Sequence, residues 1–206
     1  MSSARRRYKL VARAEAAAKT RARMLEALRL QLVESSLSSV TLEETAKRAG
    51  VARSTIYDAF GSRLGMFQAL AAGMSQTAAF RRLQEAIADP VARRAVKRSL
   101  AAGTAFYEAE HMVSRALGQL AASDPDAAGA VGMLDFGRRL AMAELARRLS
   151  EQGQLRDGVT LAEAADMLSV LSSFSTFEEL RVGRSLSVRQ VQTRLQAMAD
   201  RSLCSA

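Results

Sequence analysis

Residues 41–60, TLEETAKRAGVARSTIYDAF, decide the fold, because they read as two short helices joined by a glycine turn. Thr41 and Glu44 have the spacing of a capping box, which predicts that a helix begins at Thr41. Small or apolar residues then recur at intervals of three and four and so share one inward face: Leu42, Thr45, Ala46 and Ala49. Gly50 follows where this helix must end, at a position that often requires a positive φ angle.

The second helix of this stretch is predicted over about residues 53–59. Ile56 and Phe60 lie one turn apart on its inner side. The remaining side chains face solvent: Arg53, Ser54, Thr55, Tyr57 and Asp58. Such side chains can enter a major groove and hydrogen-bond to base edges or phosphates. The pattern therefore predicts a helix-turn-helix, although two amphipathic helices and a glycine turn also occur in other small helical domains.

The flanking sequence adds one helix on each side of the motif. TRARMLEAL at residues 20–28 precedes it and SRLGMF at residues 62–67 follows it. With VTLEETAKRAGVARSTIYDAF between them, these runs resemble the TetR family of bacterial transcriptional regulators. The family patterns are TRxxILxAA, T(T/V)xxIAxxAGVSxGTLYxHF and SKExLF. The resemblance covers about residues 20–72 and implies a dimer that binds double-stranded DNA. The residues expected to contact DNA are Thr41, Arg53, Ser54, Thr55, Tyr57 and Arg63.

Two departures from the family pattern affect the second helix of the motif. Ala52 stands where the family usually has the Ser that caps this helix, and losing such a cap costs about 1 kcal/mol. Asp58 would repel phosphate unless a cation such as Arg53 neutralises it. We expect both to weaken DNA binding without changing the fold.

Composition favours helix throughout the 206 residues. Hydrophobic residues make up 49% of the chain, but there are two prolines and no tryptophan. We therefore expect an all-α protein with one small module and one larger bundle. With the roles that the resemblance implies, the expected parts are a basic N-terminal arm at 1–19, a helix-turn-helix DNA-binding domain at 20–66, and a helical ligand-binding and dimerisation domain at 67–206. The single cysteine, Cys204, excludes an intramolecular disulfide and a multi-cysteine zinc site. No metal and no cofactor are expected.

The formal charge of +9 is concentrated toward the N-terminus. Residues 1–60 hold twelve Lys and Arg against six Asp and Glu. A basic segment beside a helix-turn-helix attracts a polyanion. The arm at 1–19 therefore reads either as a DNA contact or as a solvated tail, and the pattern does not separate the two. No apolar run is long enough for a membrane span and no secretory signal is recognised, so we expect a cytoplasmic protein with no membrane contact.

The larger domain is predicted as a series of helices. A long helix from Ser62 ends before Asp89-Pro90 and joins the two domains, either as a lever or as a rigid connector. One or two helices follow over 91–122, and another ends near Gly153. The last two helices are expected over about 160–182 and 187–203. Each begins with a capping box, Thr160 with Glu163 and Ser187 with Gln190.

The resemblance also implies an apolar cavity for a small effector in this larger domain. The candidate lining residues are Met74, Phe106, Tyr107, His111, Phe136 and Leu140. Methionine and aromatic side chains are more often part of a helical core than of a pocket. The single histidine, His111, is likewise more often a surface or boundary residue than a ligand contact.

The resemblance further implies that the last two helices pair with their copies across a two-fold axis. The residues expected at this interface are Leu171, Phe174, Glu178, Val191, Leu195 and Met198. The alternative is that these stripes face the chain's own core.

Together with these patterns, the resemblance implies a dimeric repressor that a small, largely apolar effector releases from a palindromic operator. One alternative is a DNA-binding regulator or activator without an effector. Another is an enzyme or interaction protein that keeps only the scaffold. The sequence holds no GxSxG, no HExxH and no phosphate-binding glycine loop, so we expect no enzymatic activity.

Overall fold

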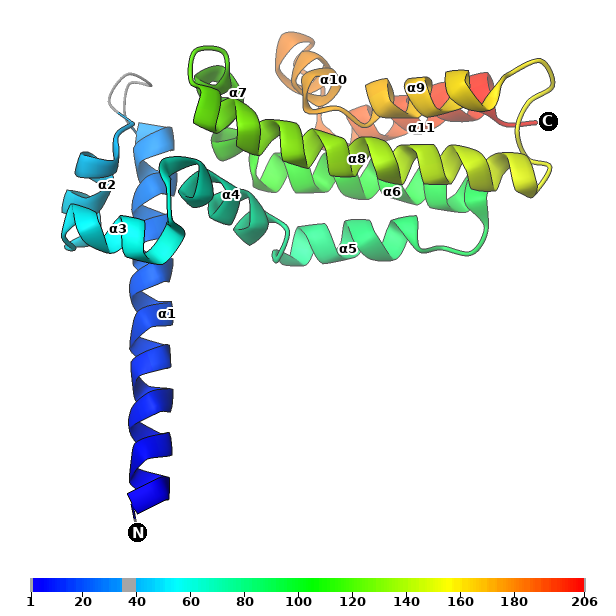
Figure 1. Cartoon of the computed structure of the whole chain (residues 1–206). Helices are drawn as coiled ribbons and strands as arrows, with labels where there is room; N and C mark the ends of the chain where they lie inside the picture. Colours follow the sequence, from blue (N-terminus) through cyan, green and yellow to red (C-terminus); the bar gives the residue numbers. More distant parts are fainter. Residues whose placement is uncertain (1, 35–39, 206) are drawn as a thin grey trace. The chain divides into compact units, whose positions relative to one another are not determined.

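The computed structural model describes residues 2–34 and 40–205, and within these ranges the chain is helical, with loops and one isolated bridge between Leu155 and Cys204. The all-α prediction is confirmed. In chain order (Figure 1) the elements are α1 Ser2–Glu34, α2 Leu42–Ala49, α3 Arg53–Phe60, α4 Arg63–Met74, α5 Ala78–Ile87, α6 Ala92–Ala109, α7 His111–Ala121, α8 Pro125–Glu151, α9 Leu161–Leu171, α10 Phe174–Glu178, the π-helix η2 Glu179–Gly183, and α11 Val188–Leu203.

The chain divides into two compact units. The N-terminal unit contains Met1–Ala72 together with Arg115–Ala130, and the C-terminal unit contains Gly73–Ser114 together with Val131–Ala206. The division differs from the expected one after residue 66 in two respects. The first unit includes most of α4, and the end of α7 and the start of α8 return to it from later in the sequence.

The N-terminal unit is built around one apolar core. Leu28, Ile56 and Phe67 come from α1, α3 and α4, and their side chains are fully buried. α2 is fastened to α1 by a buried polar contact, in which the Thr45 hydroxyl donates to Gln31 Oε1 at 2.7 Å. Because both side chains are inaccessible to water, this bond satisfies groups that would otherwise destabilise the fold.

α1 begins at Ser2, well before the helix start that the motif pattern predicts near residue 20. Its first half contains five alanines between residues 12 and 18 and no glycine or proline. Alanine has the highest helix propensity, and the packed second half supplies a nucleus from which the helix extends at little cost. The arm is therefore a continuation of α1.

The predicted single helix from Ser62 to Ile87 is wrong, because the chain breaks between α4 and α5. Thr77 is the N-cap of α5: its hydroxyl oxygen accepts a hydrogen bond from the Phe80 N–H at 3.2 Å and donates one to the Met74 carbonyl at 2.9 Å. A threonine that bonds to the backbone in this way competes with helix continuation. No continuous helix therefore spans residues 62–87, whether as a lever or as a rigid connector.

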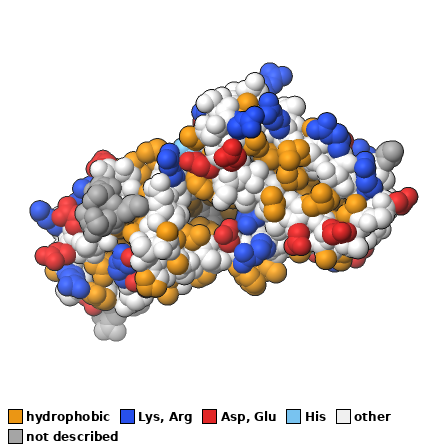
Figure 2. All heavy atoms as spheres, turned by 90° about the horizontal axis from the view of Figure 1, so that it is seen from above, with side chains coloured by type: hydrophobic (Ala, Val, Ile, Leu, Met, Phe, Trp, Pro, Cys, Tyr) orange, Lys and Arg blue, Asp and Glu red, His pale blue; other side chains and the backbone are white. Residues whose placement is uncertain are grey.

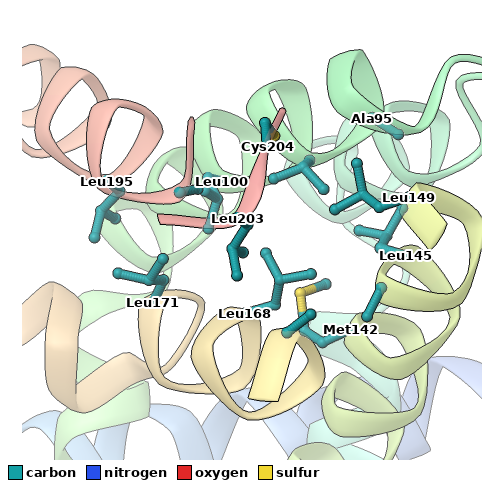
Figure 3. Close-up of a cluster of buried hydrophobic side chains, with 14 of the residues drawn as sticks. Ala95, Leu100, Met142, Leu145, Leu149, Leu168, Leu171, Leu195, Leu203 and Cys204 are labelled. Carbon is teal, nitrogen blue, oxygen red and sulfur yellow. The ribbon is translucent and has the colours of Figure 1, made fainter. Parts of the chain in front are cut away.

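The C-terminal unit is a helical bundle whose core joins α6, α8, α9 and α11. Figure 3 shows leucine and methionine side chains from these helices meeting in one cluster. Leu145, Leu149 and Leu168 are completely buried, and so are Val191 and Leu203 from α11. The Asp89 carboxylate, at the loop before α6, is buried and accepts hydrogen bonds from Arg94 and Arg98 at 2.7 Å each.

The expected helix over 160–182 is divided into α9, α10 and η2. Its predicted capping box is present, with Thr160 and Glu163 bonded reciprocally. α9 ends at Leu171, and Ser173 then caps α10 by accepting from the Thr176 N–H at 3.1 Å. A serine at this position ends one helix and starts the next, which an apolar stripe alone does not reveal. The second predicted box, Ser187 with Gln190, starts α11.

Candidate nucleic-acid interface

The turn between α2 and α3 has the geometry that the sequence predicts. Thr41 caps α2 and accepts a hydrogen bond from the Glu44 N–H at 3.2 Å. Gly50 has φ +64° and ψ +41°, and the Val51 N–H donates to the Ala46 carbonyl at 3.0 Å. This left-handed glycine closes α2 sharply and lets α3 start three residues later. The second bond of the predicted capping box would run from the Thr41 N–H to the Glu44 carboxylate. In the structure this carboxylate instead accepts a hydrogen bond from Arg48 Nε at 3.1 Å.

α3 presents a polar face to solvent, as predicted from its phase. Ile56 is fully buried, while Arg53, Ser54 and Tyr57 are exposed and Thr55 is half-buried. Arg53 lies one turn from Tyr57, its guanidinium carbon 5.8 Å from the ring centroid. The cation is therefore directed along the outer face of α3 toward Tyr57.

The start of α3 lacks a side-chain cap. Ala52 occupies the N-cap with extended backbone angles and makes no side-chain hydrogen bond there. The first turn is closed by the backbone, since the Thr55 N–H donates to the Ala52 carbonyl at 3.0 Å. The departure noted in the sequence is thus a real loss of one hydrogen bond at the helix that would face DNA.

Arg21 holds α1 to the end of α3, a role that sequence reasoning missed. Its Nη1 donates to the Ala59 carbonyl at 2.5 Å, and its guanidinium carbon stacks 4.1 Å from the centroid of the Phe60 ring. The signal was present in the TR pair at residues 20–21, which matched the family pattern without an assigned function. Arg21 fixes the direction of α1 relative to the last turn of α3.

Arg63 is placed differently from its predicted role on phosphate. Its Nη1 lies 2.6 Å from the Asp124 carboxylate, its Nη2 donates to the Val40 carbonyl at 3.1 Å, and its guanidinium covers the Phe67 ring at 4.8 Å. Less than a quarter of the side chain is exposed. Arg63 therefore already takes part in an internal ion pair, and its contact with phosphate stays a prediction. The helical phase of Arg63 could not reveal this ion pair, because Asp124 is 61 residues away in the sequence.

The Asp124 carboxylate that receives Arg63 also caps the start of α8. It accepts hydrogen bonds from the backbone N–H groups of Asp126 and Ala127 at 3.0 Å each. Burial acts to raise the pKa of Asp124, but the bonds from Ala127 and Arg63 outweigh it and hold the pKa below its usual value. The side chain is 17% exposed, so the charge is partly desolvated and depends on these partners.

Gly65 lies where α4 passes the end of α3. A Cβ atom added at this position would lie 2.1 Å from the Phe60 carbonyl oxygen, far closer than any van der Waals contact. The Gly65 N–H donates to the Ser62 hydroxyl at 2.9 Å, which caps the first turn of α4. The close approach of the two helices therefore depends on the absence of a side chain.

The structure brings together three of the six predicted effector residues. Phe106, Tyr107 and His111 join Phe174 and Phe177, with neighbouring ring centroids 5.3–6.0 Å apart. We call these five residues, with Phe80, the aromatic cluster.

Two polar atoms of the aromatic cluster are bonded to other residues of the C-terminal unit. His111 Nε2 lies 2.5 Å from the Glu178 carboxylate. The Tyr107 hydroxyl donates to the Ser172 carbonyl at 3.2 Å, and burial raises the pKa of Tyr107 to about 12.

The other three effector candidates lie elsewhere. Met74 is buried but makes none of these ring contacts, and Phe136 and Leu140 are 58% and 56% exposed on α8. The assignment of Phe136 and Leu140 to an internal cavity is therefore corrected. A surface hollow of about 270 Å³ is lined by Ser187, Arg189, Gln190, Thr193 and Arg194, none of which was predicted to bind the effector.

The predicted dimer residues divide between core and surface. Leu171, Val191 and Leu195 are buried within the chain's own core, so their assignment to a partner is corrected. Phe174 and Glu178 take part in the contacts of the aromatic cluster, and Met198 is 44% exposed. An apolar stripe indicates only that a helix face is buried. Here the face is buried by other helices of the same chain.

Comparisons with known proteins agree with this geometry. Residues 25–70 match the family model described as bacterial regulatory proteins, tetR family. No curated protein sequence matches significantly. None of the described helices contains a stretch long and apolar enough to span a membrane.

Solved structures similar to the chain cover nearly all of it. NalD of Pseudomonas aeruginosa, the secondary repressor of the MexAB-OprM multidrug efflux pump, matches with a TM-score of 0.71 and 20% identity over 92% of this chain and 98% of that one. A TetR-family regulator from Rhodococcus sp. matches with a TM-score of 0.70 and 16% identity over 90% of this chain and 99% of that one. A transcriptional regulator from Saccharomonospora viridis, solved in complex with choline, matches with a TM-score of 0.64 and 20% identity over 92% of this chain and 100% of that one. Residues 25–70 thus match the model of the TetR-family regulatory proteins, and the chain as a whole has the fold of TetR-family transcriptional regulators.

Proposed function

We propose that the protein is a dimeric repressor that binds a palindromic operator through α3 and leaves it when a small effector binds the C-terminal unit. The observation that carries the DNA-binding part is the exposed face of α3, where Arg53, Ser54 and Tyr57 project beside the tight turn at Gly50. One α3 helix can contact few base pairs, whereas two copies about 34–36 Å apart read successive major grooves. NalD, which has the same fold, is a repressor, and this supports repression over activation.

The test begins with genomic fragments selected by the purified protein, followed by footprinting of the site they share. Tyr57→Ala and Arg53→Ala should each weaken binding to that site by about 5- to 150-fold, corresponding to about 1–3 kcal/mol per specific contact. Arg82→Ala, which removes an exposed arginine from α5, is the matched control and should bind as the wild type does. Equal affinity of all three variants would reject α3 as the reading helix.

The aromatic cluster is the proposed effector site. Its rings offer an apolar surface, and Glu178 and the Tyr107 hydroxyl supply polar atoms at its edge. Pockets for small molecules combine such apolar walls with a few polar groups. Phe174→Ala should keep operator binding but lose release by a compound that releases the wild type. A variant released at the same compound concentration as the wild type would place the effector elsewhere.

The proposed dimer surface is formed by exposed apolar side chains on α8 and α9. Met133, Phe136 and Leu140 follow one stripe of α8, and Met167 and Val170 lie on α9. Arg138 connects the two stripes, because it donates to the Ser169 carbonyl and to Ser172 Oγ.

Figure 2 shows one face of the molecule, where hydrophobic side chains reach the surface of the C-terminal unit between charged ones. Apolar surface of this kind is typical of protein interfaces. Phe136→Glu with Val170→Glu should yield a folded monomer in analytical ultracentrifugation. A variant that stays dimeric at micromolar concentration would contradict this surface.

A second candidate is a DNA-binding regulator without an effector. The packing of the aromatic cluster favours it, since the rings already contact each other and the Tyr107 hydroxyl already donates to the Ser172 carbonyl. Operator binding that no compound weakens, across a broad library of small molecules, would select this candidate.

A further inference from the structure

The first half of α1 is a basic helix that packs against nothing described in its own chain. Residues 2–19 contain six Lys and Arg and one acidic residue, Glu15. The side chains of residues 7, 8 and 10–19 are all exposed. Figure 1 shows this half of α1 extending past α2 and α3 within the N-terminal unit. We refer to residues 2–19 as the basic helix.

We propose that the basic helix is a second DNA-binding element, which contacts the phosphates of the duplex flanking the site that α3 reads. This inference rests on the proposed DNA-binding function and adds a contact that the helix-turn-helix does not provide. The following three observations carry it.

The first observation is the anchoring of the basic helix to the reading helix. Arg21 lies two residues beyond it and is bonded to Ala59 and stacked on Phe60, the last residues of α3. α1 continues through this point without a glycine or proline. The basic helix therefore leaves the domain beside α3, and a duplex that receives α3 lies within its reach.

The second observation is that the basic helix is already ordered as a rod. Eighteen residues at 1.5 Å each span about 27 Å, which corresponds to about eight base pairs of duplex. Because the helix is continuous with the packed half of α1, DNA binding does not have to fix its backbone, and little entropy is lost. A solvated tail would have to be ordered before it could hold several cations in register.

The third observation is the distribution of side chains around the basic helix. Arg7, Arg13 and Lys19 are exposed cations spread along its length. The apolar side chains Tyr8, Leu10 and Val11 are also exposed. At 100° per residue Tyr8 and Val11 are neighbours, but Leu10 points away from both, and the cation Lys19 points in nearly the same direction as Tyr8. A helix that lies on a lipid surface needs one continuous apolar face. The chemistry fits a strongly charged, hydrated partner such as the DNA backbone.

The experiment measures the salt dependence of operator affinity for a variant with three cations removed. Arg7→Ala, Arg13→Ala and Lys19→Ala are combined, because alanine preserves the helix. Each phosphate contact contributes about 0.9 to the slope of log K against log salt, so the slope should fall by up to about 2.7. Between 50 and 200 mM salt, the wild type should then lose up to about 40-fold more affinity than the variant.

A charge-matched control separates local contacts from the general positive field. Arg82→Ala, Arg156→Ala and Arg189→Ala remove three exposed arginines from the C-terminal unit and should leave the slope unchanged. The difference between wild type and basic-helix variant should also disappear on a probe trimmed to the footprint of α3, because the flanking phosphates are then absent.

The outcomes distinguish this inference from the proposed function. If the wild type selects and protects no DNA site, the proposed function fails. If the wild type protects a site but the basic-helix variant has the same slope on the long probe, this inference alone is overturned. Binding of the wild type to phosphatidylcholine–phosphatidylglycerol vesicles that the variant loses, with an unchanged slope on DNA, would assign the helix to a membrane surface instead.

Discussion

Replacing Arg63 by methionine separates its observed structural contact from its predicted contact with DNA. In the structure the guanidinium neutralises Asp124 and donates to the Val40 carbonyl. Arg63→Met removes the charge and the donors but keeps a flexible apolar side chain against Phe67. If the internal ion pair is the main role of Arg63, the variant loses stability; if Arg63 binds phosphate, it loses DNA affinity.

The expected loss follows from the exposure of the two partners. An exposed ion pair contributes up to about 1 kcal/mol, and breaking a fully buried one costs about 3–5 kcal/mol. Arg63 and Asp124 are 23% and 17% exposed, and Asp124 keeps its two backbone donors in the variant. We therefore expect about 2 kcal/mol, or a fall in Tm of roughly 4–8 °C for a chain of this size.

The assay combines thermal denaturation with operator titration at several salt concentrations. Asp124→Asn should destabilise the protein by a similar amount, and the double variant should cost less than the sum of the two. Because the pKa of Asp124 is lowered in the folded state, its contribution is present above its usual pKa and is lost as the pH falls through the lowered value. The Tm difference between wild type and Arg63→Met should therefore shrink as the pH falls below the usual pKa of an aspartate.

Unchanged stability of Arg63→Met, together with a salt slope reduced by about 0.9, would refute this reasoning and restore the phosphate contact. Retained affinity with lowered stability would support it.

Three further changes test other parts of the structure. Ala52→Ser should supply the missing cap of α3, stabilise the protein by about 0.5–1 kcal/mol and raise operator affinity, as measured by urea denaturation and titration. The pKa of Asp89 lies well below its usual range, chiefly because Arg94 donates to its carboxylate, so Asp89→Asn should lower the Tm at pH 7. Its effect should shrink as the pH falls below about 4, because the aspartate of the unfolded chain is then protonated while the folded one stays ionised. Leu195→Glu places a charge in the bundle core and should cost at least about 3 kcal/mol, seen as loss of helix by circular dichroism, whereas Phe136→Glu should leave the fold intact.

The sequence predicted the helix-turn-helix well because its signals are local. A cap at Thr41, a left-handed glycine at Gly50 and an inward Ile56 each act within a few residues, and each is confirmed. Breaks after Met74 and Leu171 were missed, since Thr77 and Ser173 cap new helices within stretches whose apolar pattern continues.

Contacts between distant residues were beyond reach of pattern analysis. Arg63 looked like a free cation at the head of a helix, because its partner Asp124 lies 61 residues away. Leu195 looked equally suited to a partner subunit and to the core, since both bury an apolar stripe. Residues 35–39 lie outside the described part of the chain.

Gly65 limits how sequence can be exchanged between this chain and its relatives. The family pattern SKExLF leaves this position open, which suggests that any residue is acceptable there. In this chain, however, the Phe60 carbonyl occupies the space of the first side-chain atom. Grafting a residue from a relative at position 65 alone would push α3 and α4 apart. Chimeric DNA-binding domains should therefore exchange residues 53–74 as one block, so that the spacing of the two helices and the size of the residue between them are inherited together.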